Sequence, residues 1–145
     1  MIRKATIADI PCLVALGISF MRESQYSTHL SINRQAQAKL AMMLIRVNHG
    51  LLLVDDRDGE IVGMIGVLAT LHPHSDDAVM SELFWYVKPS HRGSGVRLLM
   101  AAEKWARAHG IRKSIVVSPS TAVSDFYLRM GYERLEEQFI KDLGT

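Results

Sequence analysis

Hydrophobic residues recur every three or four positions in several segments of the chain, and this spacing predicts amphipathic helices. These segments are residues 10–21, 36–47, 95–109 and 121–130. Other segments are short and rich in aliphatic, β-branched or aromatic residues, as is typical of strands. They are residues 2–5, 51–54, 60–69, 79–87, 114–117 and 136–141. The polar stretch 24–33 predicts a loop.

Local signals agree with these boundaries. Thr6 and Asp9 have the spacing of a capping box, in which two side chains bond free amide groups at a helix start. An Asp-Gly step at 58–59 lies between two strand patterns and predicts a hairpin. Ser120 or Thr121 can cap the last helix, and a glycine follows its end.

The order of the elements is strand, two helices, three strands, helix, strand, helix, strand. This order predicts an α/β fold of the α+β type, with a mixed, mostly antiparallel sheet, helices on both faces and one parallel βαβ crossover. The length of 145 residues fits a single domain, 1–145.

Composition narrows the class of protein. Hydrophobic residues make up 48% and charged residues 22%, which is typical of a globular chain. The net charge of +2 comes without a basic stripe, so we expect no nucleic-acid partner. No apolar run reaches the ~18 residues that a bilayer requires, so we expect no membrane association. Cys12 is the only cysteine, expected as a small buried residue, and its isolation favours a reducing, cytoplasmic compartment.

The segment after Val87 carries the most informative pattern. Pro89 prevents the strand from continuing, and a turn containing Gly93 and Gly95 opens directly into a helix. Free amides and the positive end of the helix dipole favour an anion at such a place, and Arg92 and Arg97 add charge. A dinucleotide fingerprint lacks its third glycine here, and a Walker loop lacks its Gly-Lys pair. A glycine turn that only starts a helix stays the plainer alternative.

The pattern continues beyond this turn. Arg92-Gly93-Ser94-Gly95-Val96-Arg97 resembles the R/Q-x-x-G-x-G/A signature of the GNAT superfamily of acyl-coenzyme A N-acyltransferases. Residues 122–132 are similar to a second family element, A-x-x-(F/L)-Y-x-x-x-G-F, and residues 2–10 are similar to family N-termini. Two places differ from the family: Arg97 stands at the final Gly/Ala position, and Ser118-Pro119-Ser120 replaces a frequent Asn.

The resemblance implies an N-acetyltransferase that moves an acetyl group from acetyl-coenzyme A (acetyl-CoA) to an amine by direct attack. It implies that Tyr127 protonates the leaving thiolate and that Glu82 is the general base. The alternatives are a core aromatic for Tyr127 and a solvated or structurally paired charge for Glu82. The residues expected to bind the cofactor are Trp85, Tyr86, Val87, Arg92, Gly93, Ser94, Gly95, Val96, Arg97, Ser120 and Ser124.

The resemblance also places Glu23, Tyr26 and His29 beside the acceptor amine, although they are equally compatible with an ordinary loop. We expect no metal: the polar cluster at 72–77 is better explained as an exposed loop. The acceptor stays unidentified, and a homodimer is compatible with the family. The competing function is a non-catalytic GNAT-like module that binds acyl-CoA or a protein.

Overall fold

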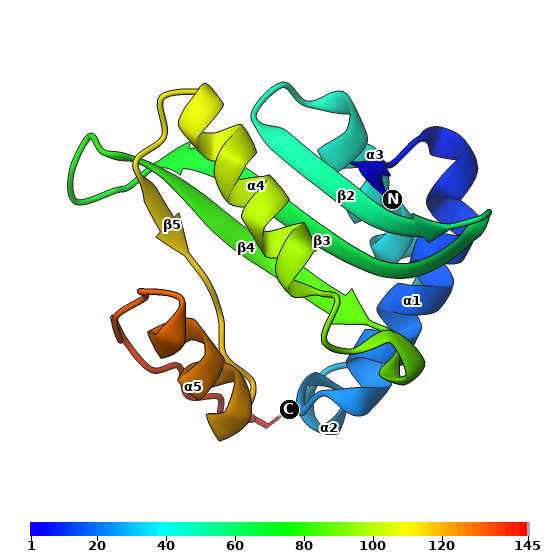
Figure 1. Cartoon of the computed structure of the whole chain (residues 1–145). Helices are drawn as coiled ribbons and strands as arrows, with labels where there is room; N and C mark the ends of the chain where they lie inside the picture. Colours follow the sequence, from blue (N-terminus) through cyan, green and yellow to red (C-terminus); the bar gives the residue numbers. More distant parts are fainter. Residues whose placement is uncertain (145) are drawn as a thin grey trace.

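A five-stranded mixed sheet forms the centre of the computed structural model, which describes residues 1–144 (Figure 1). Thr145, the last residue of the predicted domain, lies outside the described residues. The strands are β1 (Ile2–Lys4), β2 (Gly50–Arg57), β3 (Glu60–Leu71), β4 (Ala78–Val87) and β5 (Lys113–Ile115). They lie side by side in chain order, antiparallel except for the parallel pair β4 and β5. The predicted sheet class is therefore confirmed.

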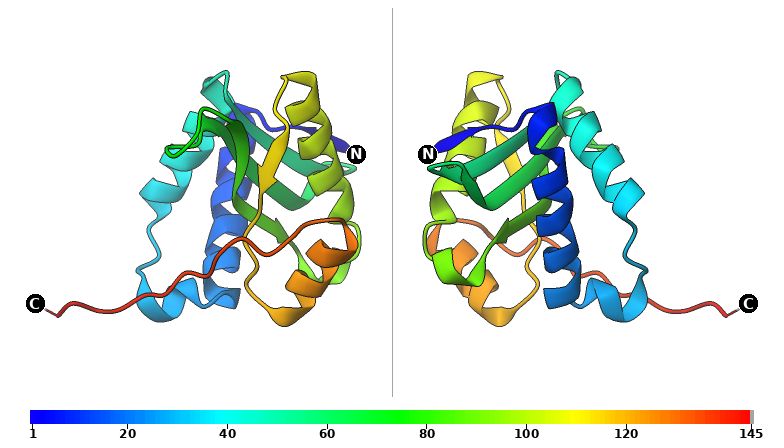
Figure 2. Two further views of the ribbon diagram at one scale, coloured as in Figure 1. Left: turned by 90° about the vertical axis from the view of Figure 1, so that its left-hand side faces the viewer. Right: turned by 90° about the vertical axis from the view of Figure 1, so that its right-hand side faces the viewer.

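Helices cover both faces of this sheet, as predicted (Figures 1 and 2). They are α1 (Ile10–Glu23), α2 (Tyr26–His29), α3 (Arg34–Arg46), α4 (Val96–Ala108) and α5 (Thr121–Arg129), with short 3-10 turns η1 (Ile7–Asp9) and η2 (Pro89–His91). The predicted capping box forms before α1, where the Asp9 carboxylate accepts a hydrogen bond from the Thr6 amide at 2.7 Å.

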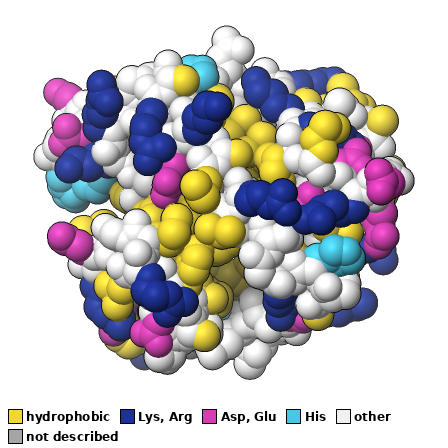
Figure 3. Space-filling view, in the orientation of Figure 1, with side chains coloured by type: hydrophobic (Ala, Val, Ile, Leu, Met, Phe, Trp, Pro, Cys, Tyr) yellow, Lys and Arg dark blue, Asp and Glu magenta, His cyan; other side chains and the backbone are white. Residues whose placement is uncertain are grey.

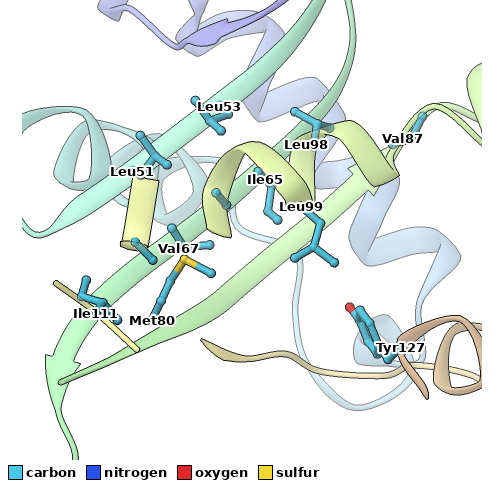
Figure 4. Close-up of a cluster of buried hydrophobic side chains, with 12 residues drawn as sticks. Leu51, Leu53, Ile65, Val67, Met80, Val87, Leu98, Leu99, Ile111 and Tyr127 are labelled. Atoms are coloured by element: carbon cyan, nitrogen blue, oxygen red, sulfur yellow. The ribbon is translucent and has the colours of Figure 1, made fainter. Parts of the chain in front are cut away.

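Two apolar cores hold the layers together because each helix buries one stripe against the sheet. On one face, α1 and α3 pack on the sheet through residues such as Leu16 and Leu44. On the other face, Leu98 and Leu99 of α4 are fully buried against the sheet (Figure 4). This packing fixes the start of α4 beside the end of β4.

The sheet opens between β4 and β5. Their pairing extends only from Val79 opposite Lys113 to Ser81 opposite Ile115, whereas β4 stays paired with β3 as far as Val87. The second half of β4 therefore pairs with no described strand on its β5 side, and the two strands separate from Glu82 onward. A cleft opens in this face of the molecule (Figure 3).

A β-bulge interrupts β4 at the start of this cleft. Glu82 lies opposite Val67 and Phe84 lies opposite Gly66, so Leu83 has no partner in the register. A bulge shifts the alternation of side chains by one position. Phe84 accordingly joins the core under α1 and α3, while Glu82 reaches α5 on the opposite face.

Three sequence expectations are corrected. The strand predicted over residues 136–141 is wrong: this segment is extended but pairs with no described strand. The predicted loop 24–33 contains the short helix α2. Cys12 is exposed rather than buried, because it faces away from the apolar stripe of α1. The pattern of an extended apolar segment does not reveal whether a partner strand is available.

Candidate active site

The turn before α4 has the geometry of an anion cradle. Within residues 1–144, the backbone N–H groups of Gly93, Gly95 and Val96 donate to no backbone carbonyl. α4 is 13 residues long, so the positive end of its dipole is added to these free amides. Such a group of donors fits a phosphate or pyrophosphate without requiring a cationic side chain.

The two glycines serve this turn in different ways. Gly93 has a φ of +99°, a conformation that strongly favours glycine. Gly95 has ordinary helical angles, but a Cβ there would lie 2.9 Å from Cγ2 of Val87 and 3.1 Å from the Trp85 ring. Gly95 therefore lets the start of α4 lie directly against β4.

Trp85 forms the floor of the cradle. Its ring packs against Gly95, and its centroid lies 6.0 Å from that of Tyr127. The indole Nε1 is buried and has no hydrogen-bond partner among the described residues. An unpaired buried donor is costly, so its presence beside free amides indicates a place that suits a ligand with acceptor oxygens. The residues present therefore fit a nucleotide cofactor with a pyrophosphate.

The guanidinium of Arg92 contacts other groups of the protein and is not simply a free cation for a phosphate. It forms an ion pair with Glu23 at 3.1 Å, and its Nε donates to the carbonyl of Val87 at 3.2 Å. It also lies over the ring of Tyr86, 5.8 Å from the centroid. Arg92 thus connects the end of α1 to the end of β4. Arg97 is exposed on the first turn of α4.

Hydrogen bonds among Glu82, Tyr127 and Val117 join β4 to α5 in the cleft. The phenol oxygen of Tyr127 lies 3.3 Å from Oε2 of Glu82 and 3.2 Å from the carbonyl oxygen of Val117. The amide of Val117 donates to the same Oε2 at 2.9 Å. The structure therefore brings together the two residues expected to be catalytic and adds the peptide groups of Val117.

The surroundings shift the acidity of both residues. Burial raises the pKa of Glu82 to about 7, although the hydrogen bonds from Val117 and Tyr127 partly oppose this change. Burial and the neighbouring Glu82 raise the pKa of Tyr127 well above its ordinary range. At neutral pH the site thus holds a carboxyl group that exchanges protons readily and a phenol that stays protonated. This combination suits general acid–base chemistry.

The serines expected to bind cofactor organise the turn before α5. Ser120 caps this helix, because its hydroxyl accepts a hydrogen bond from the amide of Val123 at 3.3 Å. The hydroxyl of Ser124 lies 2.6 Å from that of Ser118. These contacts hold the wall of the cleft that carries Val117.

A cavity of about 210 Å³ lies on the other face of the sheet, between α1, α3 and β4. Its lining is mostly apolar: Gly17, Phe20, Met21, Tyr26, Gln37, Leu40, Met64, Leu83 and Phe84. Of the three residues expected beside the acceptor, only Tyr26 is among them. Glu23 is paired with Arg92, and His29 is exposed at the end of α2. The bulge at Leu83 gives this cavity part of its wall, and no pattern in the sequence predicts it.

Seen from outside, hydrophobic side chains gather in the hollowed centre of the face that carries α4 and α5, with Lys and Arg side chains around it (Figure 3). This surface suits a ligand with an apolar arm and anionic groups. Within residues 1–144, no group of three or more His, Cys, Asp and Glu side chains is placed to hold a metal ion.

The sequence profile of the acetyltransferase (GNAT) family matches residues 17–132, which include the cradle, Glu82 and Tyr127. The chain belongs to the acetyltransferase (GNAT) family. The predicted family and the predicted enzyme class are confirmed. Among curated proteins, no sequence matches this chain.

Solved structures of other acetyltransferases share this GNAT fold. A predicted acetyltransferase from Clostridium acetobutylicum, solved with acetyl-CoA, is 17% identical, with a TM-score of 0.82 over 99% of this chain and 96% of that chain. The protein AAC(6')-Iy, solved with the bisubstrate analogue CoA-S-monomethyl-acetylneamine, is 18% identical, with a TM-score of 0.77 over 100% of this chain and 98% of that chain. A ribosomal-protein-alanine N-acetyltransferase from Brucella melitensis is 16% identical, with a TM-score of 0.71 over 99% of this chain and 99% of that chain.

No described helix of this GNAT chain is long and apolar enough to cross a membrane.

Proposed function

We propose that this GNAT chain transfers an acetyl group from acetyl-CoA to a primary amine, with the donor held between the α4 cradle and the β4–β5 cleft. The observation that carries the proposal is the contact of Tyr127 with Glu82 inside that cleft. The free amides before α4 and the unpaired Trp85 nitrogen beside them support the place of the donor. The solved Clostridium acetobutylicum relative contains acetyl-CoA, which agrees with this choice.

Each residue of the site has a role in the reaction that follows from its position. When bound, acetyl-CoA supplies a thioester whose acyl group is transferred. Glu82 takes a proton from the amine, and a pKa near 7 suits a base at neutral pH. Tyr127 is protonated at neutral pH and can therefore donate its proton to the departing sulfur. The cradle amides orient the donor, which lowers the entropy cost of bringing the reactants together.

The acceptor is proposed to enter from the side of α1, α2 and β4, where the 210 Å³ cavity lies, and to present its amine to Glu82 where β4 and β5 no longer pair. Because Phe20, Tyr26 and Leu83 line it, we propose an amine carried on an apolar or aromatic body. Glu23 adds little attraction for a cation, since Arg92 already neutralises it. Solved structures with this fold include an enzyme bound to CoA-S-monomethyl-acetylneamine and a ribosomal-protein-alanine N-acetyltransferase, so the fold by itself does not select the acceptor.

A homodimer is proposed from the C-terminal segment. Residues 133–144 leave α5 as an extended chain that projects past α2 (Figure 2). Leu135, Phe139 and Leu143 on this segment are 71%, 90% and 89% exposed. β5 ends the sheet and pairs only with β4 among the described residues. A second copy offers both an open strand edge and an equivalent apolar segment, so an exchange of segments would cover both.

The reducing, cytoplasmic compartment also stays a proposal, and the exposed free thiol of Cys12 is compatible with it.

Release of free thiol from acetyl-CoA across a panel of amines tests the proposed function. We expect turnover with at least one amine on an apolar body, and a loss of about a hundredfold in kcat for Tyr127→Phe with little change in KM. Tyr132→Phe is a matched control, because its phenol bonds Glu103 and Ser114 outside the cleft and should affect stability more than turnover. Tight acetyl-CoA binding without turnover on any amine would favour the non-catalytic alternative.

A further inference from the structure

Glu82 and Tyr127 share one hydrogen-bonded unit in a way that separate acid and base roles do not require. Both the Tyr127 phenol and the Val117 amide reach the same carboxylate atom, Oε2 of Glu82. The other carboxylate atom, Oε1, has no hydrogen-bond partner among residues 1–144. One side of the carboxylate thus faces the tyrosine, and the other side is available to an amine.

The phenol proton has two alternative acceptors. The Tyr127 oxygen lies within hydrogen-bond distance of Oε2 of Glu82 and of the Val117 carbonyl, but it has a single hydrogen to donate. When Glu82 is ionised, the phenol can donate to it. When Glu82 is protonated, the carboxyl can donate to the phenol oxygen, which then turns its own hydrogen toward Val117 or toward the cleft. The contact therefore works in both directions.

We propose that Glu82 and Tyr127 form a proton relay that returns the proton lost by the amine to the departing sulfur. This inference rests on the proposed function and concerns how its two catalytic residues are connected. The Val117 peptide is the positioning group, because its N–H and its carbonyl hold the carboxylate and the phenol at 2.9 and 3.2 Å.

The proton count of the relay closes within one turnover of a neutral amine. As the new C–N bond forms, the nitrogen loses one proton to the Glu82 carboxylate. As the C–S bond breaks, the Tyr127 phenol gives its proton to the sulfur and becomes a phenolate. The Glu82 carboxyl then gives its proton to that phenolate oxygen. The net result is one proton moved from nitrogen to sulfur, with both side chains restored.

The positions of the groups make the last transfer feasible. The carboxyl torsion of a glutamate is broad, so a proton received at Oε1 can be turned toward the tyrosine without moving the strand. The partner oxygen is 3.3 Å away, within reach for a hydrogen bond that shortens during the reaction. A buried phenolate is expensive, and an adjacent proton donor removes that charge at once.

A double-mutant cycle tests the relay directly. Glu82→Gln, Tyr127→Phe and the double variant would be compared by kcat at neutral pH, with the Kd of acetyl-CoA as a check that each variant is folded. A single relay predicts that each substitution lowers kcat by roughly a hundredfold and that the double variant is no slower than the slower single variant. Losses that multiply, to roughly ten-thousandfold, would overturn the relay while leaving both individual roles intact.

Two other outcomes concern the proposed function instead. If neither substitution lowers kcat while the natural chain turns over, the catalytic assignments are wrong, and the relay with them. If the natural chain has no turnover with any amine, the enzyme proposal itself fails. As a second readout, the relay predicts that Glu82→Gln removes a rise in kcat centred near pH 7, a change that a purely structural role of Glu82 would not produce.

Discussion

At the scale of single residues, the proposed mechanism depends on the ionisation of Glu82. Its carboxyl group is taken out of water by the packing of β4 against the wall that carries Val117, and burial disfavours its charged form. The two hydrogen bonds on Oε2 favour the charged form but do not cancel this effect. The residue is therefore left close to half-ionised at neutral pH, which is the condition of an efficient general base.

The raised pKa predicts how stability depends on pH. Between the ordinary value of 4.5 and about 7, the folded chain binds more protons at Glu82 than the unfolded chain does. The free energy of unfolding therefore falls as pH rises through this window, by up to about 3 kcal/mol from this residue. Glu82→Gln removes the contribution, so this variant should gain stability relative to the natural chain as pH rises. Urea unfolding of both proteins at about pH 5 and about pH 8 measures this gain. If the difference in free energy of unfolding between the variant and the natural chain does not change with pH, the raised pKa is contradicted.

Sequence alone predicts the two residues but not their contact. Tyr127 and Glu82 were expected from the family resemblance, yet 45 positions separate them and no periodicity connects them. The ion pair of Arg92 with Glu23 spans 69 positions and was not foreseen either. Such contacts depend on how β4, α1 and α5 pack, which is a property of the assembled core.

At the scale of elements, the start of α4 combines a turn that requires a positive φ with a close approach to β4. Gly93 supplies the positive φ, and Gly95 supplies the space for Trp85 and Val87. The Gly-rich turn and the amphipathic pattern after it predicted this element well, because both signals are local. The bulge at Leu83 was missed, since one extra residue in a strand leaves no mark on composition.

Two glycines with positive φ allow the effect of backbone strain in a variant to be distinguished from an effect on ligand binding. Gly93 and Gly110 have φ values of +99° and +74°, and neither would place a Cβ within 4 Å of another group. Gly93→Ala and Gly110→Ala should therefore each lower the free energy of unfolding by about 1–2 kcal/mol. Only Gly93→Ala should also weaken acetyl-CoA binding, because Gly110 lies at the far end of α4. Equal effects on acetyl-CoA affinity in calorimetric titration would contradict the cradle.

At the scale of the whole molecule, the C-terminal segment 133–144 forms no described helix or strand and exposes large apolar side chains. Residues 136–141 are predicted to form a strand, but the structure leaves this segment extended and pairs it with no described strand. Large exposed apolar side chains on an extended segment are unfavourable in water. The sequence signal was one of strand propensity, and it carried no information about which edge the strand would join.

The dimer proposal predicts the oligomeric state of matched variants. Light scattering after size exclusion should give a dimer for the natural chain and a monomer when Phe139→Asp and Leu143→Asp are combined. Leu71→Asp is the control, because this leucine is 64% exposed on another part of the surface and should leave the dimer intact. A natural chain that stays monomeric at micromolar concentration would exclude the exchange of C-terminal segments.

The central claim is that the α4 cradle and the adjoining cleft hold an acyl-CoA donor. Calorimetric titration of acetyl-CoA into the natural chain, Gly95→Glu and Ala108→Glu tests it most directly. Gly95→Glu places a carboxylate at the free amides, whereas Ala108→Glu adds the same charge at the exposed opposite end of the same helix. Because a side chain at Gly95 also crowds Val87 and Trp85, urea unfolding of each variant shows that it is folded under the conditions of the titration. We predict binding by the natural chain and by Ala108→Glu, and loss of binding by Gly95→Glu. Unchanged affinity in Gly95→Glu, or no binding by the natural chain, would contradict the account.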